Sequence, residues 1–349
     1  LLLTFDDCNG DEPQRGGGGG GGSGEQGHTP ICLSSCEIAS RDAVPFSSNC
    51  VPGGSCSRTT FSLLTYNIWF HGSNQLAATA AARSGQPDPT DNFVERMDAV
   101  ANVILATDAD VVCLQECTPW SFALFSKNDS LTSRYDMSKY GRQGRYGVSM
   151  LVRKGWRAQE AGSNEVAPFV WTEMPTMMGR SLLSTQVRPP SLPTRVVHVS
   201  TAHFESLASA RTREEQLKVC ACVAAEEVSG PSIVAGDFNF CSYRNYNDAP
   251  GPLENDVLTR VLPDHTDVWP SLAGNHGEDG GDLFGYTFDS ERNSNIQQAE
   301  QMRYDRILFR DGPGGRGYAT SAELVGMEKI VALGMHPSDH FGVLCRFRI

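Results

Sequence analysis

The most informative stretch of the chain is Ser232-Ile233-Val234-Ala235-Gly236-Asp237-Phe238-Asn239. Its first part, residues 232–235, predicts a buried strand, because a short apolar run that ends at a glycine is typical of one. Two polar side chains, Asp237 and Asn239, follow the strand directly. Segments at strand ends commonly carry chemistry on a rigid scaffold. We therefore expect a functional site at the end of this strand.

Other predicted strands also end in, or are followed by, polar side chains. Asn67 closes residues 61–67, and Glu116 closes residues 111–116. His203 and Glu205 come at the end of residues 195–203, and Asp339-His340 precedes residues 343–347. Each alone is explained by a solvated turn, an Asx turn or a hydrogen-bonded core histidine. The whole set favours one shared site.

The remaining pattern predicts an α/β domain with many strands and few helices. Further strands are expected at residues 146–152, 180–187, 304–309 and 322–325. One helix is expected to start at a cap formed by Asp91 or Asn92 and to end near residue 106, and a second to span 208–228. This balance predicts two packed β-sheets flanked by helices.

The first 58 residues differ from the rest. They contain an uninterrupted glycine run, Gly16 to Gly22, and no hydrophobic period, which predicts a flexible segment. Its later cysteines form two pairs, so the segment is either a small zinc module or a chain with incidental cysteines: Cys32, Cys36, Cys50 and Cys56. Residues 59–349 are expected to form the catalytic domain. Because the sequence starts with Leu1 rather than methionine, we expect it to be a piece of a longer chain.

Composition excludes several classes of protein. The 349 residues carry a formal net charge of −12, which argues against charge-driven coating of nucleic acid but not against an enzyme that grips a few phosphates. No apolar run is long enough for a membrane-spanning helix. Eleven cysteines are an odd number for a closed disulfide framework, and several lie in apolar runs, which favours a reducing compartment.

The polar set suits the hydrolysis of a phosphodiester, which needs its charge neutralised and a water molecule placed in line. Glu116, with Asp339 or Asn67, is expected to hold Mg²⁺. Asp237 is expected to deprotonate the attacking water. The phosphate and that water would be positioned by the remaining polar residues, Asn67, Asn239 and His203. His340, paired with Asp339, would stabilise developing charge.

The order of these motifs carries a family resemblance. The chain resembles the endonuclease/exonuclease/phosphatase superfamily in four motifs: Asn67, Gln115-Glu116, Gly236-Asp237-Phe238-Asn239 and Ser338-Asp339-His340. Within it, residues 59–349 are most similar to the 5′-tyrosyl-DNA phosphodiesterases. The narrower resemblance is carried by Met177-Met178-Gly179-Arg180, His203-Phe204-Glu205-Ser206, Asp267-Val268-Trp269, Tyr286-Thr287-Phe288-Asp289, Asn293-Ser294-Asn295 and Arg303-Tyr304-Asp305-Arg306.

The resemblance implies a four-layer α/β sandwich that uses Mg²⁺ or Mn²⁺ and removes topoisomerase II remnants from DNA 5′ ends. It implies Glu116 as metal ligand and Asp237 as proton acceptor. Trp269 is then either a base-stacking residue or a core residue, and Asn295 contacts substrate. We expect a monomer in the nucleus, or in both nucleus and cytoplasm, that touches no membrane and binds any partner protein through residues 1–58. Arg303, Asp305 and Arg306 are expected to form a structural ion pair under the site.

Two departures from the vertebrate-type pattern matter. Trp69 stands where those enzymes carry an aspartate, so one acidic contributor to the metal site is missing. Phe240-Cys241 replaces a Leu-Arg pair, and Arg244 is expected to supply the lost substrate contact. Two other functions stay open: another hydrolase of the superfamily, acting on abasic DNA, RNA tails, phosphoinositides or sphingomyelin, and a catalytically degenerate binding protein.

Overall fold

The structure is a computed structural model that describes residues 60–70, 92–139, 146–158, 166–190, 194–226, 230–272, 283–315 and 317–349. All of these ranges belong to one compact unit, residues 56–349. The predicted flexible segment or zinc module at residues 1–58 lies outside the described residues. So does the predicted cap Asp91. None of the described helices combines the length and apolarity needed to cross a membrane.

Two six-stranded sheets form the centre of the unit. Both are mixed, because β1 pairs parallel with β2 but antiparallel with β14, and β8 pairs parallel with β7 but antiparallel with β12. The first sheet runs β13 (Tyr318–Val325), β14 (Gly342–Arg348), β1 (Thr60–Asn67), β2 (Val111–Cys117), β4 (Gly147–Arg153) and β3 (Tyr135–Met137). The second runs β5 (Val170–Glu173), β6 (Ser181–Val187), β7 (Val197–His203), β8 (Ser232–Asp237), β12 (Asp305–Arg310) and β9 (Thr266–Asp267).

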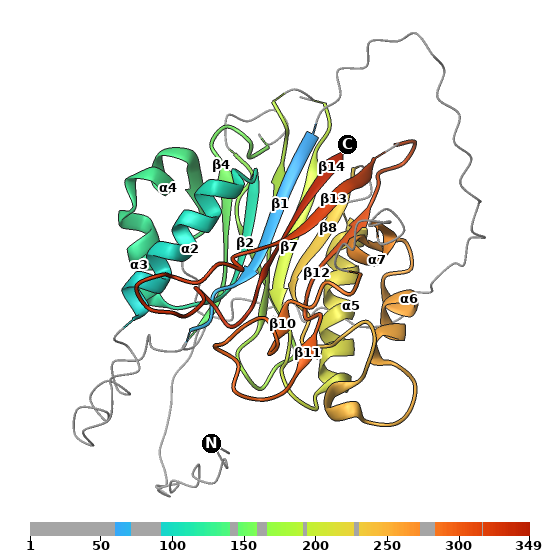
Figure 1. Cartoon of the computed structure of the whole chain (residues 1–349). Helices are drawn as coiled ribbons and strands as arrows, with labels where there is room; N and C mark the ends of the chain where they lie inside the picture. Colours follow the sequence, from blue (N-terminus) through green and yellow to red (C-terminus); the bar gives the residue numbers. More distant parts are fainter. Residues whose placement is uncertain are drawn as a thin grey trace, which may run out of the picture. The chain divides into compact units, whose positions relative to one another are not determined.

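Helices cover the outer faces of both sheets (Figure 1). One apolar cluster packs the first sheet against α2 (Phe93–Thr107), α3 (Pro119–Lys127) and α4 (Asp129–Arg134). Another packs the second sheet against α5 (Ala210–Glu226) and α6 (Val257–Val261). The largest cluster lies between the two sheets, where their inner faces meet α7 (Val268–Leu272). The predicted four-layer sandwich is confirmed.

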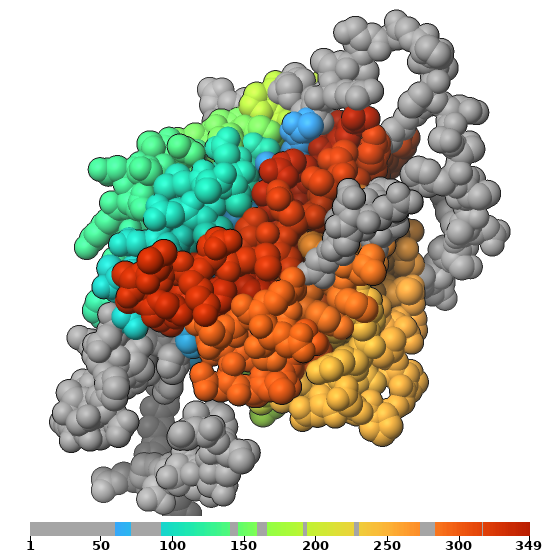
Figure 2. All heavy atoms as spheres, in the orientation of Figure 1, coloured from blue at the N-terminus to red at the C-terminus, as the bar shows by residue number. Residues whose placement is uncertain are grey.

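Short elements complete the unit. The two-stranded pair β10 (Phe288–Asp289) and β11 (Gln301–Met302) lies apart from both large sheets. Two single turns of 3-10 helix, η1 (Tyr246–Asp248) and η2 (Glu254–Asp256), follow β8. The C-terminal residues form a band across one face, between α2–α4 and the segment after β8 (Figure 2).

The predicted long elements match the observed ones closely, and the short ones were missed. Strands β2, β7 and β8 are almost completely buried, as expected for strands covered on both faces, although β7 also carries buried polar residues. Helices α3 and α4 were not predicted, although Thr118 and Ser121 form a capping box before α3. The predicted cap Asn92 does precede α2, but its side chain makes no capping hydrogen bond.

Sheet register brings the predicted site residues to one edge. β1, β2, β7 and β8 end at that edge, because β1 and β2 are parallel, as are β7 and β8. The antiparallel strands β12 and β14 begin there. As a result Asp237 is in register with His203 on one side and with Asp305 on the other. His340 lies two residues before β14 begins.

Gly236 is required where β8 reaches this edge. Its φ is +145°, and a Cβ at this position would lie 1.9 Å from the carbonyl oxygen of Ala202 on β7. Only glycine lets the two parallel strands approach while their polar ends stay side by side. The residue immediately before Asp237 therefore serves the site through strand packing.

We predict that Gly236→Ala lowers the free energy of unfolding by about 3 kcal/mol, since the new methyl group must displace the Ala202 backbone. Chemical denaturation measures the change. Gly314→Ala is the matched control, because Gly314 also has a positive φ, +67°, but open space around it. It should cost about 1 kcal/mol. Equal losses in the two variants would show that the close approach to β7 does not constrain the fold.

Candidate active site

Asp237 lies at the centre of the candidate site. Its Oδ2 accepts a hydrogen bond of 2.9 Å from Asn67 Nδ2, which comes from the other sheet. Its Oδ1 accepts a hydrogen bond of 2.9 Å from the backbone N–H of Asn239. Burial, together with the nearby Asp305 carboxylate, raises the pKa of Asp237 to about 6. Asp237 is therefore a fixed carboxylate and a stronger base than an ordinary aspartate.

His203 faces the same carboxylate from β7. Its Nε2 lies 3.4 Å from Asp237 Oδ2, and its Nδ1 lies 2.9 Å from Arg180 Nη1. Arginine only donates, so Nδ1 must be the acceptor and Nε2 carries the hydrogen that points toward Asp237. Burial and the Arg180 charge hold the pKa of His203 well below its usual range. His203 is thus a neutral donor.

His340 is paired with Asp305, so the predicted pairing of His340 with Asp339 is wrong. Its Nδ1 lies 2.7 Å from Asp305 Oδ2, and the Asp305 side chain is fully buried. Burial alone would lower the pKa of His340, but the Asp305 carboxylate outweighs it and holds the pKa well above its usual range. The predicted partner, Asp339, instead meets the Ser338 hydroxyl at 3.3 Å.

The predicted ion pair under the site also has a different composition. Arg303 and Arg306 both form ion pairs with Asp267, whereas Asp305 pairs with His340. Although burial opposes ionisation of Asp267, the two guanidinium groups lower its pKa to about 2. Strand register accounts for the Asp305–His340 pairing, because Asp305 is the first residue of β12 and is in register with Asp237.

Glu116 and Asp339 form the acidic part of the site. Glu116 Oε2 accepts a hydrogen bond of 2.9 Å from the backbone N–H of Phe70. Burial, reinforced by the Asp339 charge, raises the pKa of Glu116 to about 7. Two carboxylates that disfavour each other's ionisation in this way would be stabilised by a cation between them.

Three residues of the site have a strained backbone conformation. Trp69, Glu116 and Asn239 all have positive φ, at 58°, 61° and 54°. This region costs little for asparagine but about 1–2 kcal/mol for larger side chains. Non-glycine residues persist there only where the surrounding contacts hold them, which is the pattern expected of a functional site.

The loop before His340 is fixed by side-chain amides. Asn295 Nδ2 donates to the carbonyl oxygens of His336 and Ser338, at 2.9 and 3.0 Å. Asn293 Nδ2 donates to the Ser338 carbonyl at 3.0 Å, and the Ser338 hydroxyl donates to the Asn67 carbonyl at 2.7 Å. The predicted role of Asn295 as a substrate contact stays a prediction; what its amide does here is hold the loop.

Two other predicted substrate contacts lie elsewhere. Trp269 is 4% exposed and belongs to the cluster between the sheets, so the base-stacking prediction is wrong and its core alternative is correct. Arg244 Nε lies 3.6 Å from Asp248, beyond the end of β8. Its substrate contact stays a prediction.

Sequence reasoning also missed Arg180. Its guanidinium binds His203 and the Ser206 hydroxyl, and it lies 5.1 Å from the centre of the Tyr146 ring. The loop before it is held by Glu205, whose carboxylate accepts hydrogen bonds from Thr176 and the backbone of Met177. The signal was the stretch Met177-Met178-Gly179-Arg180, which ends at the first residue of the predicted strand 180–187.

The donor atoms fit a hard divalent cation. Glu116, Asp339 and Asn67 offer carboxylate and amide oxygens, the ligands that Mg²⁺ and Mn²⁺ prefer. A second group, Asp237, Asp305 and His340, brings ligand atoms within 4.8 Å of one another and could hold a metal ion. His340 Nδ1 is already engaged with Asp305 in that group.

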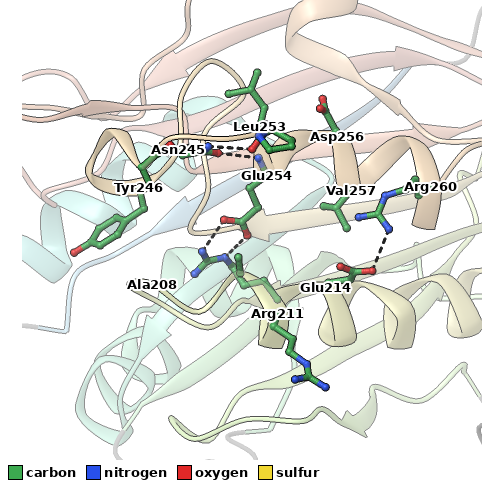
Figure 3. Close-up of a pocket in the computed structure, with 14 residues that line it drawn as sticks. Ala208, Arg211, Glu214, Asn245, Tyr246, Leu253, Glu254, Asp256, Val257 and Arg260 are labelled. Atoms are coloured by element: carbon green, nitrogen blue, oxygen red, sulfur yellow. Dashed lines mark hydrogen bonds and ion pairs between the residues drawn. The ribbon is translucent and has the colours of Figure 1, made fainter.

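A separate cavity lies to one side of this cluster. It has a volume of about 690 Å³ and is lined by the start of α5 and by residues 245–260 (Figure 3). Its charged residues are mostly paired: Arg213 with Glu254, and Arg260 with Glu214. Arg213 also donates to the carbonyl oxygens of Glu205 and Leu207, so this region anchors the segment that follows His203.

The chain belongs to the endonuclease/exonuclease/phosphatase family, whose model matches residues 64–340. This family consists of phosphoester hydrolases that generally depend on divalent metals. Its match spans the strand ends that carry Asn67, Glu116, Asp237 and His340.

Particular relatives narrow the comparison. The chain is 30% identical over 260 residues to tyrosyl-DNA phosphodiesterase 2 of Bos taurus, covering 73% of this chain and 63% of the relative. It thus spans a little under two thirds of that relative's length. Its fold is similar to tyrosyl-DNA phosphodiesterase 2 of D. rerio complexed with single-strand DNA product, with a TM-score of 0.61, 23% identity, and coverage of 83% and 100% of the two chains. A mannosyl-6-phosphatase of Bacteroides thetaiotaomicron is also similar in fold, with a TM-score of 0.56, 15% identity, and coverage of 83% and 100%.

We predict that Glu116→Gln stabilises the metal-free protein at pH 8 by about 1–2 kcal/mol. The folded-state pKa of Glu116, about 7, lies above that of an unfolded glutamate, so wild-type stability falls as the pH rises through this window. The neutral amide avoids that loss.

Denaturation in a chelating buffer measures the effect. At pH 4 both side chains are neutral and the two proteins should be equally stable. Addition of Mg²⁺ at pH 8 should stabilise the wild type more than the variant. A variant that is less stable than wild type at pH 8 without metal would contradict the account.

Proposed function

We propose that the chain is a phosphodiesterase that hydrolyses the bond between a tyrosine side chain and the 5′ phosphate of DNA. The observation that carries the proposal is the convergence on Asp237 of Asn67, His203 and the Asp305–His340 pair. The similarity of the chain to tyrosyl-DNA phosphodiesterase 2 supports this choice of substrate. On this proposal the enzyme acts in the nucleus, in repair of DNA ends that carry topoisomerase II remnants.

Asp237 accepts the proton of the attacking water. Its raised pKa still leaves it mostly ionised at neutral pH, and its orientation is fixed from both sides by Asn67 and the backbone N–H of Asn239. A base that is both fixed and matched to the working pH contributes roughly 10²–10⁴-fold to the rate of such a reaction.

The two histidines divide the remaining work. His340, kept protonated by Asp305, presents a positive charge that stabilises negative charge developing on the phosphate oxygens. His203, kept neutral by burial and by Arg180, donates from Nε2 and helps to orient the water or a phosphate oxygen. Asn67 and Asn239 keep this arrangement rigid.

Glu116 and Asp339, with Asn67, would hold Mg²⁺, or Mn²⁺ in its place. An ion held there would supply positive charge to neutralise the phosphate and the departing oxygen. A phenol has a pKa of about 10, well below that of an alcohol, so a tyrosine leaving group needs little help from a general acid. That fits a site with one strong base and a histidine whose proton is held by Asp305.

We predict that the protein with Mg²⁺ releases tyrosine from a 5′-phosphotyrosyl oligonucleotide and leaves a 5′ phosphate. Asp237→Asn should lower kcat by about 10³-fold while the fold is retained, because the amide cannot accept the proton. Arg134→Gln is the control, since Arg134 is an exposed residue of α4. Chromatography of the oligonucleotide product measures the reaction.

The outcomes separate the alternatives. If the wild type does not cleave the phosphotyrosyl bond but cleaves abasic DNA, an RNA tail, a phosphoinositide or sphingomyelin, the chain is a hydrolase of the same family with a different substrate. A protein that cleaves nothing and binds no Mg²⁺ would be a binding protein.

We predict a bell-shaped pH profile for kcat. The rate should rise as Asp237 ionises, near pH 6, and fall where His340 loses its proton, well above the ordinary histidine range. Asp305→Asn removes the carboxylate that holds this proton, so the falling limb should move to lower pH. A falling limb that stays in place in that variant would remove His340 from the mechanism.

A further inference from the structure

One buried arginine links two loops that border the proposed metal-binding side chains, the loop after β1 and the loop before Asp339. Arg96 belongs to α2, and its side chain is 2% exposed. Its Nη1 donates to the carbonyl oxygens of Pro337, at 3.0 Å, and Ile68, at 3.4 Å. Its Nη2 donates to the carbonyl oxygen of Trp69, at 3.1 Å. One guanidinium group therefore binds both the loop after β1 and the loop before Asp339.

A single peptide bond connects Arg96 to Glu116. The carbonyl of Trp69 accepts from Arg96, and the N–H of Phe70, on the other side of the same peptide unit, donates to Glu116 Oε2 at 2.9 Å. In a trans peptide the C=O and the N–H point in opposite directions. The cation, the peptide dipole and the carboxylate are thus aligned, and each hydrogen bond polarises the next.

The Trp69 side chain also contributes to this connection between Arg96 and Glu116. Its φ of 58° is unfavourable for a tryptophan, and its ring lies 4.5 Å from the Arg96 guanidinium carbon. The cation–π contact and the hydrogen bond to the Trp69 carbonyl both hold the residue in this conformation. This conformation directs the Phe70 N–H at Glu116.

We propose that Arg96, stacked on Trp69, is a positioning residue that sets the orientation of Glu116 and the spacing of Glu116 from Asp339 for a divalent cation. The inference rests on the proposed function only in assigning those carboxylates to a metal. It explains how the site keeps its geometry with tryptophan, rather than an acidic residue, at position 69: the positive side chain behind the loop fixes the carboxylates that remain.

The test is Mn²⁺ binding to the purified chain without substrate, followed by electron paramagnetic resonance. Arg96→Lys keeps the charge, but a point-like ammonium cannot replace the planar fork that reaches both loops. Arg96→Met keeps the approximate length and removes all donors. Both should weaken Mn²⁺ binding by about tenfold or more, the usual effect of losing a partner that orients a metal ligand.

Val100→Ala is the matched control, because Val100 is a buried residue of the same helix that belongs to the α2 core cluster. It should lower stability and leave Mn²⁺ binding unchanged. Saturating Mg²⁺ should restore most of the kcat of Arg96→Lys, since the lysine variant retains every group that we place at the phosphate.

The result for Arg96→Lys decides the inference even if Arg96→Met does not fold. Mn²⁺ binding as tight as in the wild type would overturn it, as would an equal loss in Val100→Ala or a wild type that binds no Mn²⁺. Failure of the proposed function looks different: Mn²⁺ binding would follow the expected order among the variants, and the phosphotyrosyl oligonucleotide would stay intact.

Discussion

One hydrogen bond ties the two halves of the molecule together at the point where chemistry takes place. Asn67 ends β1 in the first sheet, Asp237 ends β8 in the second, and the amide donates to the carboxylate at 2.9 Å. Both side chains are 1% exposed, so an unpaired partner would be costly, while a hydrogen bond to a charged group contributes about 1.5–3 kcal/mol. The contact exists only when the sheets pack in this register. Folding and assembly of the site are therefore one event.

Much of the fold and the centre of the site could be predicted, because apolar strands and their polar ends are local features of a sequence. What failed depended on partners far apart in the chain. His340 pairs with Asp305 rather than its neighbour Asp339, and only strand register reveals this. The sequence alone does not distinguish an exposed from a core position for Trp269, because that depends on the packing of α7 against the sheets. Helices α3 and α4 are too short for a hydrophobic period to stand out, and capping alone marks them.

The electrostatics of the site divide the titratable groups into opposed roles. Burial and neighbouring carboxylates raise the pKa of Asp237 and of Glu116. Asp305 keeps His340 protonated, while Arg180 helps to keep His203 neutral. A metal-free site of this kind stores free energy that a cation and a phosphate would release. The fold itself does not choose the substrate, because a mannosyl-6-phosphatase has a similar one. The substrate must be argued from the groups around Asp237.

The most direct measurement is a crystal structure of the protein with Mg²⁺ and an oligonucleotide that ends in a 5′ phosphate. The account predicts the ion bound by Glu116 and Asp339, with the terminal phosphate within hydrogen-bond reach of both His203 and His340 and next to Asp237. A phosphate bound away from these three side chains, or an ion that leaves Glu116 untouched, would contradict it.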